Sequence, residues 1–159
     1  MQFKQADILA GLSREFIARM MEVGKKSTYE QGTVLFDQGD PARNFYILVK
    51  GRVRLSIGDQ KNSIYTVNHG GEAFGWSSLA SGTNYTASAE CVASTTLIAF
   101  DRDQMEMLLS GDHENAALLY KNLALTLGNR LVSVQSQLAD QLSFEDKISY
   151  GTGQIQETV

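Results

Sequence analysis

The feature that most constrains the fold is a series of short β-prone runs between residues 27 and 100, separated from one another by turn residues. The runs cover residues 33–36, 45–49, 52–57, 64–68, 85–90 and 95–100. Segments rich in glycine, asparagine and aspartate lie between them, and the chain's one proline, Pro41, stands in the first of these turns. Strands at such short, regular spacing predict an antiparallel barrel or jelly roll rather than a parallel sheet.

Helical patterns flank this region on both sides. Residues 13–23 carry apolar side chains at helical spacing, with Ser13 as a candidate N-cap and Gly24 as a stop. Asp101, followed three residues later by Gln104, predicts the start of a short helix that ends near Leu109. Residues 114–142 then form one long helical stretch without proline. The sequence therefore predicts an α+β fold: a jelly-roll barrel with a short N-terminal helix and a long C-terminal helix.

The long helix carries an apolar seam at alternating spacings of three and four residues. Its members are Ala117, Tyr120, Ala124, Leu127, Leu131, Val134 and Leu138. This a/d pattern is typical of a helix that packs against a partner helix, which predicts a homodimer. The alternative is that the seam and a second apolar row both pack against the chain's own sheet. We expect residues 1–142 to form one domain and residues 143–159 to form a polar tail.

Composition excludes several classes of protein. The formal net charge of −4 does not provide the cationic field that non-specific nucleic-acid binding requires. Cys91 is the only cysteine, so no internal disulfide can form, which favours a cytoplasmic protein. No apolar run approaches the length of a membrane span. The two histidines lack metal-ligand spacing, and no nucleophile–base pair or phosphate-loop motif occurs, so we expect neither a metal nor a cofactor, and no enzyme.

Three separated glycine motifs, in order, resemble the cyclic nucleotide-binding domain. Residues 29–40 (YEQGTVLFDQGD) resemble that domain's opening strand and turn, and residues 45–55 (FYILVKGRVRL) resemble its next hairpin. Residues 71–75 (GEAFG) resemble the start of its phosphate-binding cassette. The resemblance covers about residues 5–140 and is closest to the sensor half of catabolite-activator-like (CRP/FNR-like) regulators. It implies a jelly roll whose long helix forms a dimer.

The resemblance also implies a site, from which this sequence departs. In the family the cassette reads approximately F-G-E, several apolar or small residues, then R, S or T, and A. Aligned to it, Gly75 and Thr86 keep the pattern, whereas Trp76 stands at the position of the ribose-binding Glu and Tyr85 at that of the phosphate-binding Arg. A charge-assisted hydrogen bond contributes roughly 1.5–3 kcal/mol, so we expect cAMP and cGMP binding in the usual mode to be weak or lost.

Two interpretations of the altered cassette remain open. Trp76 and Tyr85 are expected either to line a pocket for an apolar or aromatic ligand or to fill the vacated space. Ser77, Ser78 and Thr86 are candidate hydroxyl donors, and Arg130 on the long helix is a candidate replacement cation, as are Arg52 and Arg54.

We expect a non-enzymatic sensor domain in signal transduction that acts through a partner protein. The residues after Leu142 are too few for a helix-turn-helix domain, so we expect no direct DNA binding by this chain. The alternatives are an intact cyclic-nucleotide receptor with relocated contacts and a ligand-free interaction module.

Overall fold

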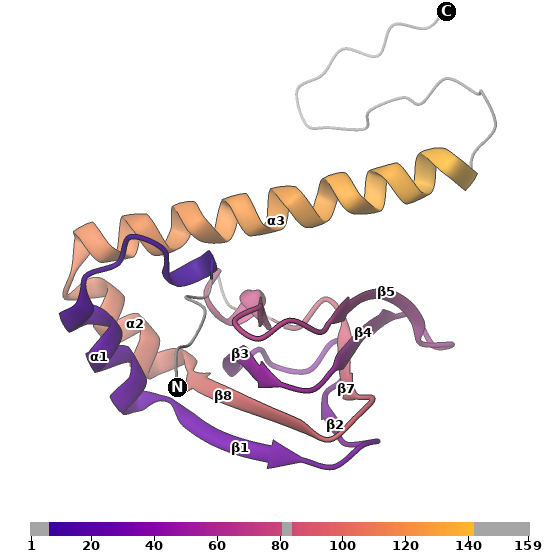
Figure 1. The fold of residues 1–159 in the computed structure, drawn as a ribbon, viewed down its shortest axis with the longest axis horizontal. Coiled ribbons are helices and arrows are strands. Elements are labelled where there is room, and N and C mark those ends of the chain that lie inside the picture. Colours follow the sequence, from indigo (N-terminus) through magenta and orange to yellow (C-terminus); the bar gives the residue numbers. More distant parts are fainter. Residues whose placement is uncertain (1–6, 81–83, 142–159) are drawn as a thin grey trace, which may run out of the picture. The chain divides into compact units, whose positions relative to one another are not determined.

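Helices flank two antiparallel sheets in the computed structural model, which describes residues 7–80 and 84–141 (Figure 1). The helices are the 3-10 turn η1 (Asp7–Leu9), α1 (Arg14–Val23), the 3-10 helix η2 (Trp76–Ser78), α2 (Arg102–Ser110) and α3 (His113–Gln141). The strands are β1 (Lys25–Tyr29), β2 (Val34–Phe36), β3 (Asn44–Lys50), β4 (Val53–Ile57), β5 (Asn62–Val67), β6 (Ala73–Phe74), β7 (Ser88–Cys91) and β8 (Thr95–Asp101). The predicted α+β class with an antiparallel roll is confirmed.

The strands form two four-stranded sheets, in the orders β1-β8-β3-β6 and β2-β7-β4-β5. Figure 1 shows α1 and α2 side by side at one end of these sheets. The chain divides into two compact units, Met1–Leu127 and Gly128–Val159, and both sheets lie in the first. α3 runs without interruption from the first unit into the second. The expected polar tail, residues 143–159, lies outside the described residues.

Two clusters of buried side chains stabilise the first unit. The helix-side cluster joins α1, α2 and the start of α3 to one face of the sheet that contains β3 and β8. The barrel cluster fills the space between the two sheets. β3 contributes to both, because Phe45 and Ile47 face the helices while Tyr46 and Leu48 face the barrel interior. Burial on both faces explains the unbroken apolar run of β3.

The helix starts follow the capping residues expected from the sequence. The Ser13 hydroxyl accepts a hydrogen bond from the backbone N–H of Phe16 at 3.2 Å, and α1 begins at the next residue after Ser13. The Asp101 carboxylate accepts from the N–H groups of Asp103 and Gln104 at 3.0 and 3.1 Å, and α2 begins at Arg102. Each cap satisfies N–H groups that have no partner within the helix.

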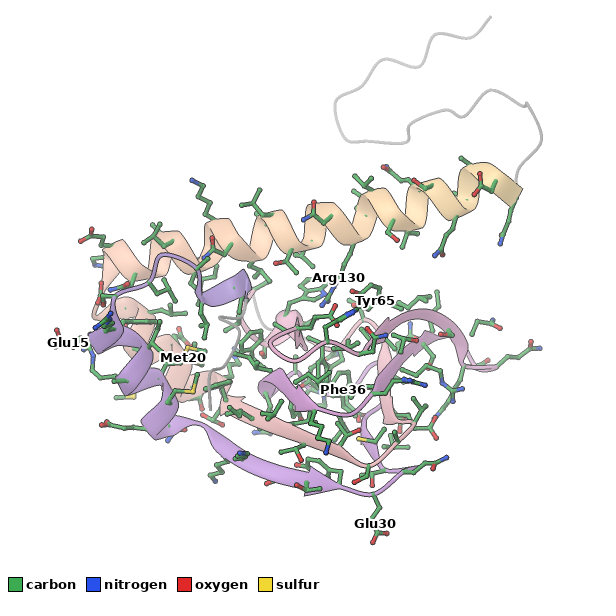
Figure 2. All side chains as sticks on the ribbon, in the orientation of Figure 1. Glu15, Met20, Glu30, Phe36, Tyr65 and Arg130 are labelled. Atoms are coloured by element: carbon green, nitrogen blue, oxygen red, sulfur yellow. The ribbon has the colours of Figure 1, made fainter. Side chains whose placement is uncertain are left out.

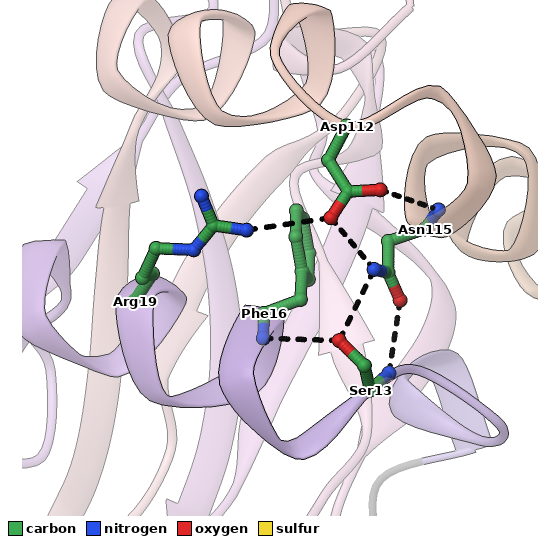
Figure 3. Close-up of polar contacts among 5 residues, drawn as sticks. All are labelled: Ser13, Phe16, Arg19, Asp112 and Asn115. Atoms are coloured by element: carbon green, nitrogen blue, oxygen red, sulfur yellow. Dashed lines mark hydrogen bonds and ion pairs between the residues drawn. The ribbon is translucent and has the colours of Figure 1, made fainter.

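A polar cluster connects the start of α1 to the start of α3 (Figure 3). The Ser13 N–H donates to Asn115 Oδ1 at 2.9 Å, and Asn115 Nδ2 donates both to the Ser13 hydroxyl and to Asp112. Asp112 also forms an ion pair with Arg19 at 3.3 Å. The hydrogen bond from the Asn115 side chain is the main reason that the pKa of the Asp112 carboxyl is lowered. The cluster joins segments that are 102 residues apart in the sequence.

Three elements differ from the sequence expectations. β1 was not expected, and it pairs along its length with β8, for example Thr28 with Thr96. β6 is a two-residue strand that pairs with β3 and likewise was not expected. β7 begins at Ser88 rather than at Tyr85, because the backbone of Tyr85 hydrogen-bonds with the turn residues Gly39 and Asp40. No helix among the described residues has both the length and the apolarity that crossing a membrane requires.

Candidate functional site

The segment that resembles a phosphate-binding cassette begins with a glycine that no other residue can replace without strain. Gly75 follows β6 and has a φ of 76°, in the left-handed region. A Cβ atom at this position would lie 2.8 Å from the backbone oxygen of Asn44. The Gly75 carbonyl accepts hydrogen bonds from the N–H of Ser78 at 3.2 Å and from its hydroxyl at 2.9 Å. These contacts form the short helix η2 directly after the glycine.

The turn before this segment is held by a residue that the sequence analysis did not single out, Glu72. Its carboxylate accepts hydrogen bonds from the N–H groups of Asn68 and His69, at 3.0 and 2.8 Å, and from the Tyr65 hydroxyl at 2.6 Å. In the sequence, Glu72 follows Asn68 and His69 by four and three residues, and this spacing is the signal that could have identified its contacts with the turn. Because these donors approach both carboxylate oxygens, Glu72 acts here as a structural residue of the turn.

Tyr85, which the sequence led us to expect at the position of a phosphate-binding arginine, lies inside the barrel and is only 5% exposed. Its ring stacks on Phe36 with a centroid distance of 3.6 Å. Its hydroxyl donates to the backbone oxygen of Asn44 at 2.7 Å and accepts from the Asn44 N–H at 2.9 Å. Burial is the main cause that raises the pKa of the Tyr85 hydroxyl. The side chain is therefore fixed at both its ring and its hydroxyl.

Tyr85 belongs to a cluster of four aromatic rings. Phe36, labelled in Figure 2, lies among the side chains between the sheets. Tyr46 and Phe74 stack with a centroid distance of 5.0 Å, and Phe36 contacts Tyr46 at 5.9 Å. Burial also raises the pKa of Tyr46 strongly. Stacked and tilted ring pairs of this kind add stability beyond the area they bury.

Trp76 does not join these rings. It is half-buried and packs against the helix-side cluster, whereas Tyr85 is part of the barrel cluster. Ser77 and Ser78 are buried in η2, and Thr86 is exposed. The structure thus places Trp76 and Tyr85 in different clusters, and it separates the two buried serines of η2 from the exposed Thr86.

The remaining expected site residues lie on α3 and β4. Arg130 lies in the unit Gly128–Val159, together with the seam residues Leu131, Val134 and Leu138, which are exposed. Tyr120 and Ala124, in the first unit, are also exposed, whereas Leu127 packs against the helix-side cluster. On β4, Arg54 forms an ion pair with Glu90 of β7 at 2.6 Å.

Within residues 7–80 and 84–141, no three histidine, cysteine, aspartate or glutamate side chains are placed to hold a metal ion together. Cys91 is buried, and burial raises the pKa of its thiol, so it is not activated as a nucleophile.

Comparison with known proteins gives consistent results. A family model described as the cyclic nucleotide-binding domain matches residues 26–112. The cyclic AMP receptor protein of Thermus thermophilus is 32% identical over 146 residues, which cover 90% of this chain and 65% of that protein. A CRP-like cAMP-activated global transcriptional regulator of Mycobacterium tuberculosis is 24% identical, over 89% of this chain and 62% of that protein. The chain thus spans just under two thirds of the length of these relatives.

Solved structures share the fold. The crystal structure of a cyclic nucleotide-binding domain from Methylobacillus flagellatus superposes with a TM-score of 0.75 at 18% sequence identity, and covers 88% of this chain and 83% of that one.

Proposed function

Because this chain belongs to the cyclic nucleotide-binding domain family, which is regulatory and non-enzymatic, we propose that it is a regulatory domain with an altered cassette. In this proposal the barrel does not bind cAMP or cGMP in the usual mode. The two charged side chains that the family pattern provides for ribose and phosphate are replaced here by Trp76 and Tyr85.

The position of Tyr85 carries this proposal. Its ring occupies barrel space against Phe36, and both hydrogen-bonding functions of its hydroxyl are satisfied by Asn44. A cyclic phosphate in the barrel would meet a neutral phenol that is already bonded instead of a guanidinium. Loss of one charge-assisted contact weakens binding by roughly 1.5–3 kcal/mol, and loss of two by more than about a hundredfold.

Thermal unfolding with and without cyclic nucleotides tests the proposal. We expect cAMP and cGMP at millimolar concentration to leave the Tm of the full chain unchanged. A ligand at about 100 times its Kd stabilises a protein by about 2.7 kcal/mol, so tight binding would raise the Tm by several degrees and contradict the proposal. A rise in Tm would favour the alternative of a cyclic-nucleotide receptor in which other residues make the contacts. Isothermal titration calorimetry then gives the Kd.

A double variant tests the proposal by introducing the two charged side chains that the wild type lacks. Trp76→Glu with Tyr85→Arg places the family's two charged side chains at their aligned positions. We expect this variant to gain measurable cAMP affinity over the wild type. The matched control, Tyr120→Arg, adds an arginine at an exposed tyrosine of α3 and is expected to gain none.

We further propose that the chain forms a homodimer through the seam of α3. The support is the heptad spacing together with the exposure of Leu131, Val134 and Leu138, which are 57%, 44% and 47% exposed in the single chain. Leu131→Asp with Leu138→Asp is expected to give a monomer by light scattering. Val132→Asp, an exposed position outside the seam, is expected to leave the mass unchanged. A monomeric wild type would contradict the proposal.

The output of such a domain is proposed to pass through a partner protein in the cytoplasm. The sequence has a single cysteine, Cys91, and so cannot form an internal disulfide, which agrees with a reducing compartment. A ligand-free interaction module is the second candidate, because Tyr85 packs among the buried side chains of the barrel cluster.

A further inference from the structure

The first unit contains an open pocket outside the barrel. It has a volume of about 510 Å³ and lies between the chain at the end of η2, one face of α2 and one face of α3. This volume falls within the range of roughly 300–1,000 Å³ that is usual for small-molecule sites. The pocket does not include any member of the four-ring cluster around Tyr85. It is therefore separate from the barrel interior.

The apolar part of the pocket comes mainly from the helix-side cluster. Leu109 of α2 and Ala116 of α3 are buried members of that cluster, and Leu79 packs against it. Tyr120 of α3, which is partly exposed, adds an aromatic ring. A ligand that contacts these side chains would remove apolar area from water, which favours a ligand with an aliphatic or aromatic group.

Glu106 of α2 supplies a carboxylate to the same pocket. It is exposed, and among the residues that the structure describes no side chain forms an ion pair with it. Arg102 also lines the pocket, but it already has an interaction within the chain, so no ligand group is assigned to it. A carboxylate forms its strongest hydrogen bonds with charged donors, so Glu106 favours a ligand that carries an ammonium group.

The end of α2 favours a positive charge for a second, independent reason. Ser110 is the last residue of α2 and lines the pocket, and the last turn of this helix contains no basic residue. A helix C-terminus carries a partial negative charge, which a cation stabilises. The Ser110 hydroxyl donates its proton to the Met107 carbonyl at 3.2 Å, which leaves its oxygen as an acceptor. Arg102 is the first residue of α2, so it lies about 12 Å from Ser110 along the helix axis.

We propose that this pocket binds a small organic cation, namely an amine with an aromatic or aliphatic group. Its ammonium group pairs with the Glu106 carboxylate near the end of α2, and its apolar group contacts Leu109 and Tyr120. His113 of α3, which also lines the pocket, offers a further acceptor when its imidazole is neutral. An anion would meet both the Glu106 carboxylate and the negative end of α2, which disfavours it. The site lies outside the barrel, so the proposal does not depend on whether the barrel binds a cyclic nucleotide.

Calorimetry of the full chain with four related probes tests the proposal. Phenethylamine carries an ammonium group and a ring, phenethyl alcohol has a neutral hydroxyl instead, phenylpropanoate has a carboxylate instead, and ethylamine lacks the ring. We expect phenethylamine to bind at millimolar concentration or below. Each of the other three should bind at least about tenfold more weakly, which corresponds to about 1.4 kcal/mol. Absence of binding by phenethylamine, or equal binding by any of the other three, would overturn the proposal.

Variants locate the binding in the pocket. Glu106→Gln removes the negative charge and is expected to weaken phenethylamine binding about tenfold. Glu22→Gln, at an exposed glutamate of α1 outside the pocket, is the matched control and should leave binding unchanged. Ser110→Trp places a bulky ring in the pocket from an exposed position on α2 and should abolish binding without disturbing the core. Full affinity in Glu106→Gln, or binding that persists in Ser110→Trp with the fold retained by circular dichroism, would contradict the proposed location.

Discussion

The replacement of Tyr85 by phenylalanine tests whether this side chain is fixed in the barrel. The ring can keep its contact with Phe36, because phenylalanine has the same ring without the hydroxyl. What is lost is the pair of hydrogen bonds with the Asn44 backbone, at 2.7 and 2.9 Å. A buried donor or acceptor left without a partner costs about 1–3 kcal/mol. Since Asn44 is half-buried, we expect Tyr85→Phe to lower the free energy of unfolding by about 2 kcal/mol.

Urea denaturation at a fixed protein concentration measures this effect, with fluorescence of the single tryptophan, Trp76, as the probe. A loss of about 2 kcal/mol corresponds to a Tm lower by roughly 4–8 °C for a chain of this size. The matched control is Tyr120→Phe, because the Tyr120 hydroxyl is exposed and makes only a 3.4 Å contact with the Leu79 oxygen. The control should stay within about 0.5 kcal/mol of the wild type. Equal stability of the Tyr85→Phe variant and the wild type would refute the anchored position of Tyr85.

Three further predictions concern other parts of the first unit. Gly75→Ala should destabilise more than Gly58→Ala in thermal unfolding, because both glycines have a positive φ but a Cβ meets the chain only at Gly75; equal losses would contradict this. Asn115→Ala should cost about 1–3 kcal/mol in urea denaturation, because it breaks the α1–α3 cluster of Figure 3, and an unchanged midpoint would show that the cluster adds no stability. Burial raises the folded-state pKa of Tyr46 and Tyr85, so the contribution of these two side chains to stability is complete below pH ~10 and is lost as the pH rises further. A spectroscopic titration in which all tyrosines of the folded protein ionise together would contradict this.

The elements that the sequence predicted well are those with local signals. Ser13 and Asp101 each occupy the N-cap position expected from their spacing to the following residues. The apolar run of β3 also identified its strand. β1 lacked such a signal, because four of its five residues are exposed and its position depends on pairing with β8, about 70 residues later in the chain.

The candidate site was less predictable, because its contacts join distant segments. The sequence assigned Tyr85 to a strand and left open whether its ring lines or fills the barrel. Its actual neighbours, Phe36 and Asn44, are about 40 to 50 residues earlier, and no local pattern specifies that contact. Trp76 illustrates the same difficulty: its nearness to Tyr85 in the cassette did not indicate that the two residues pack in different clusters.

The two-sided burial of β3 has a consequence for how this protein tolerates mutation. Most strands on a sheet surface alternate between positions that tolerate substitution and positions that do not. A scan of all substitutions along such a strand therefore shows tolerance at every second residue. From Phe45 to Leu48 we instead expect four consecutive positions that do not tolerate substitution, because every side chain there is buried. A library meant to remodel this domain should therefore leave those four positions unchanged and draw its diversity from strands with a solvent face, such as β1 and β5.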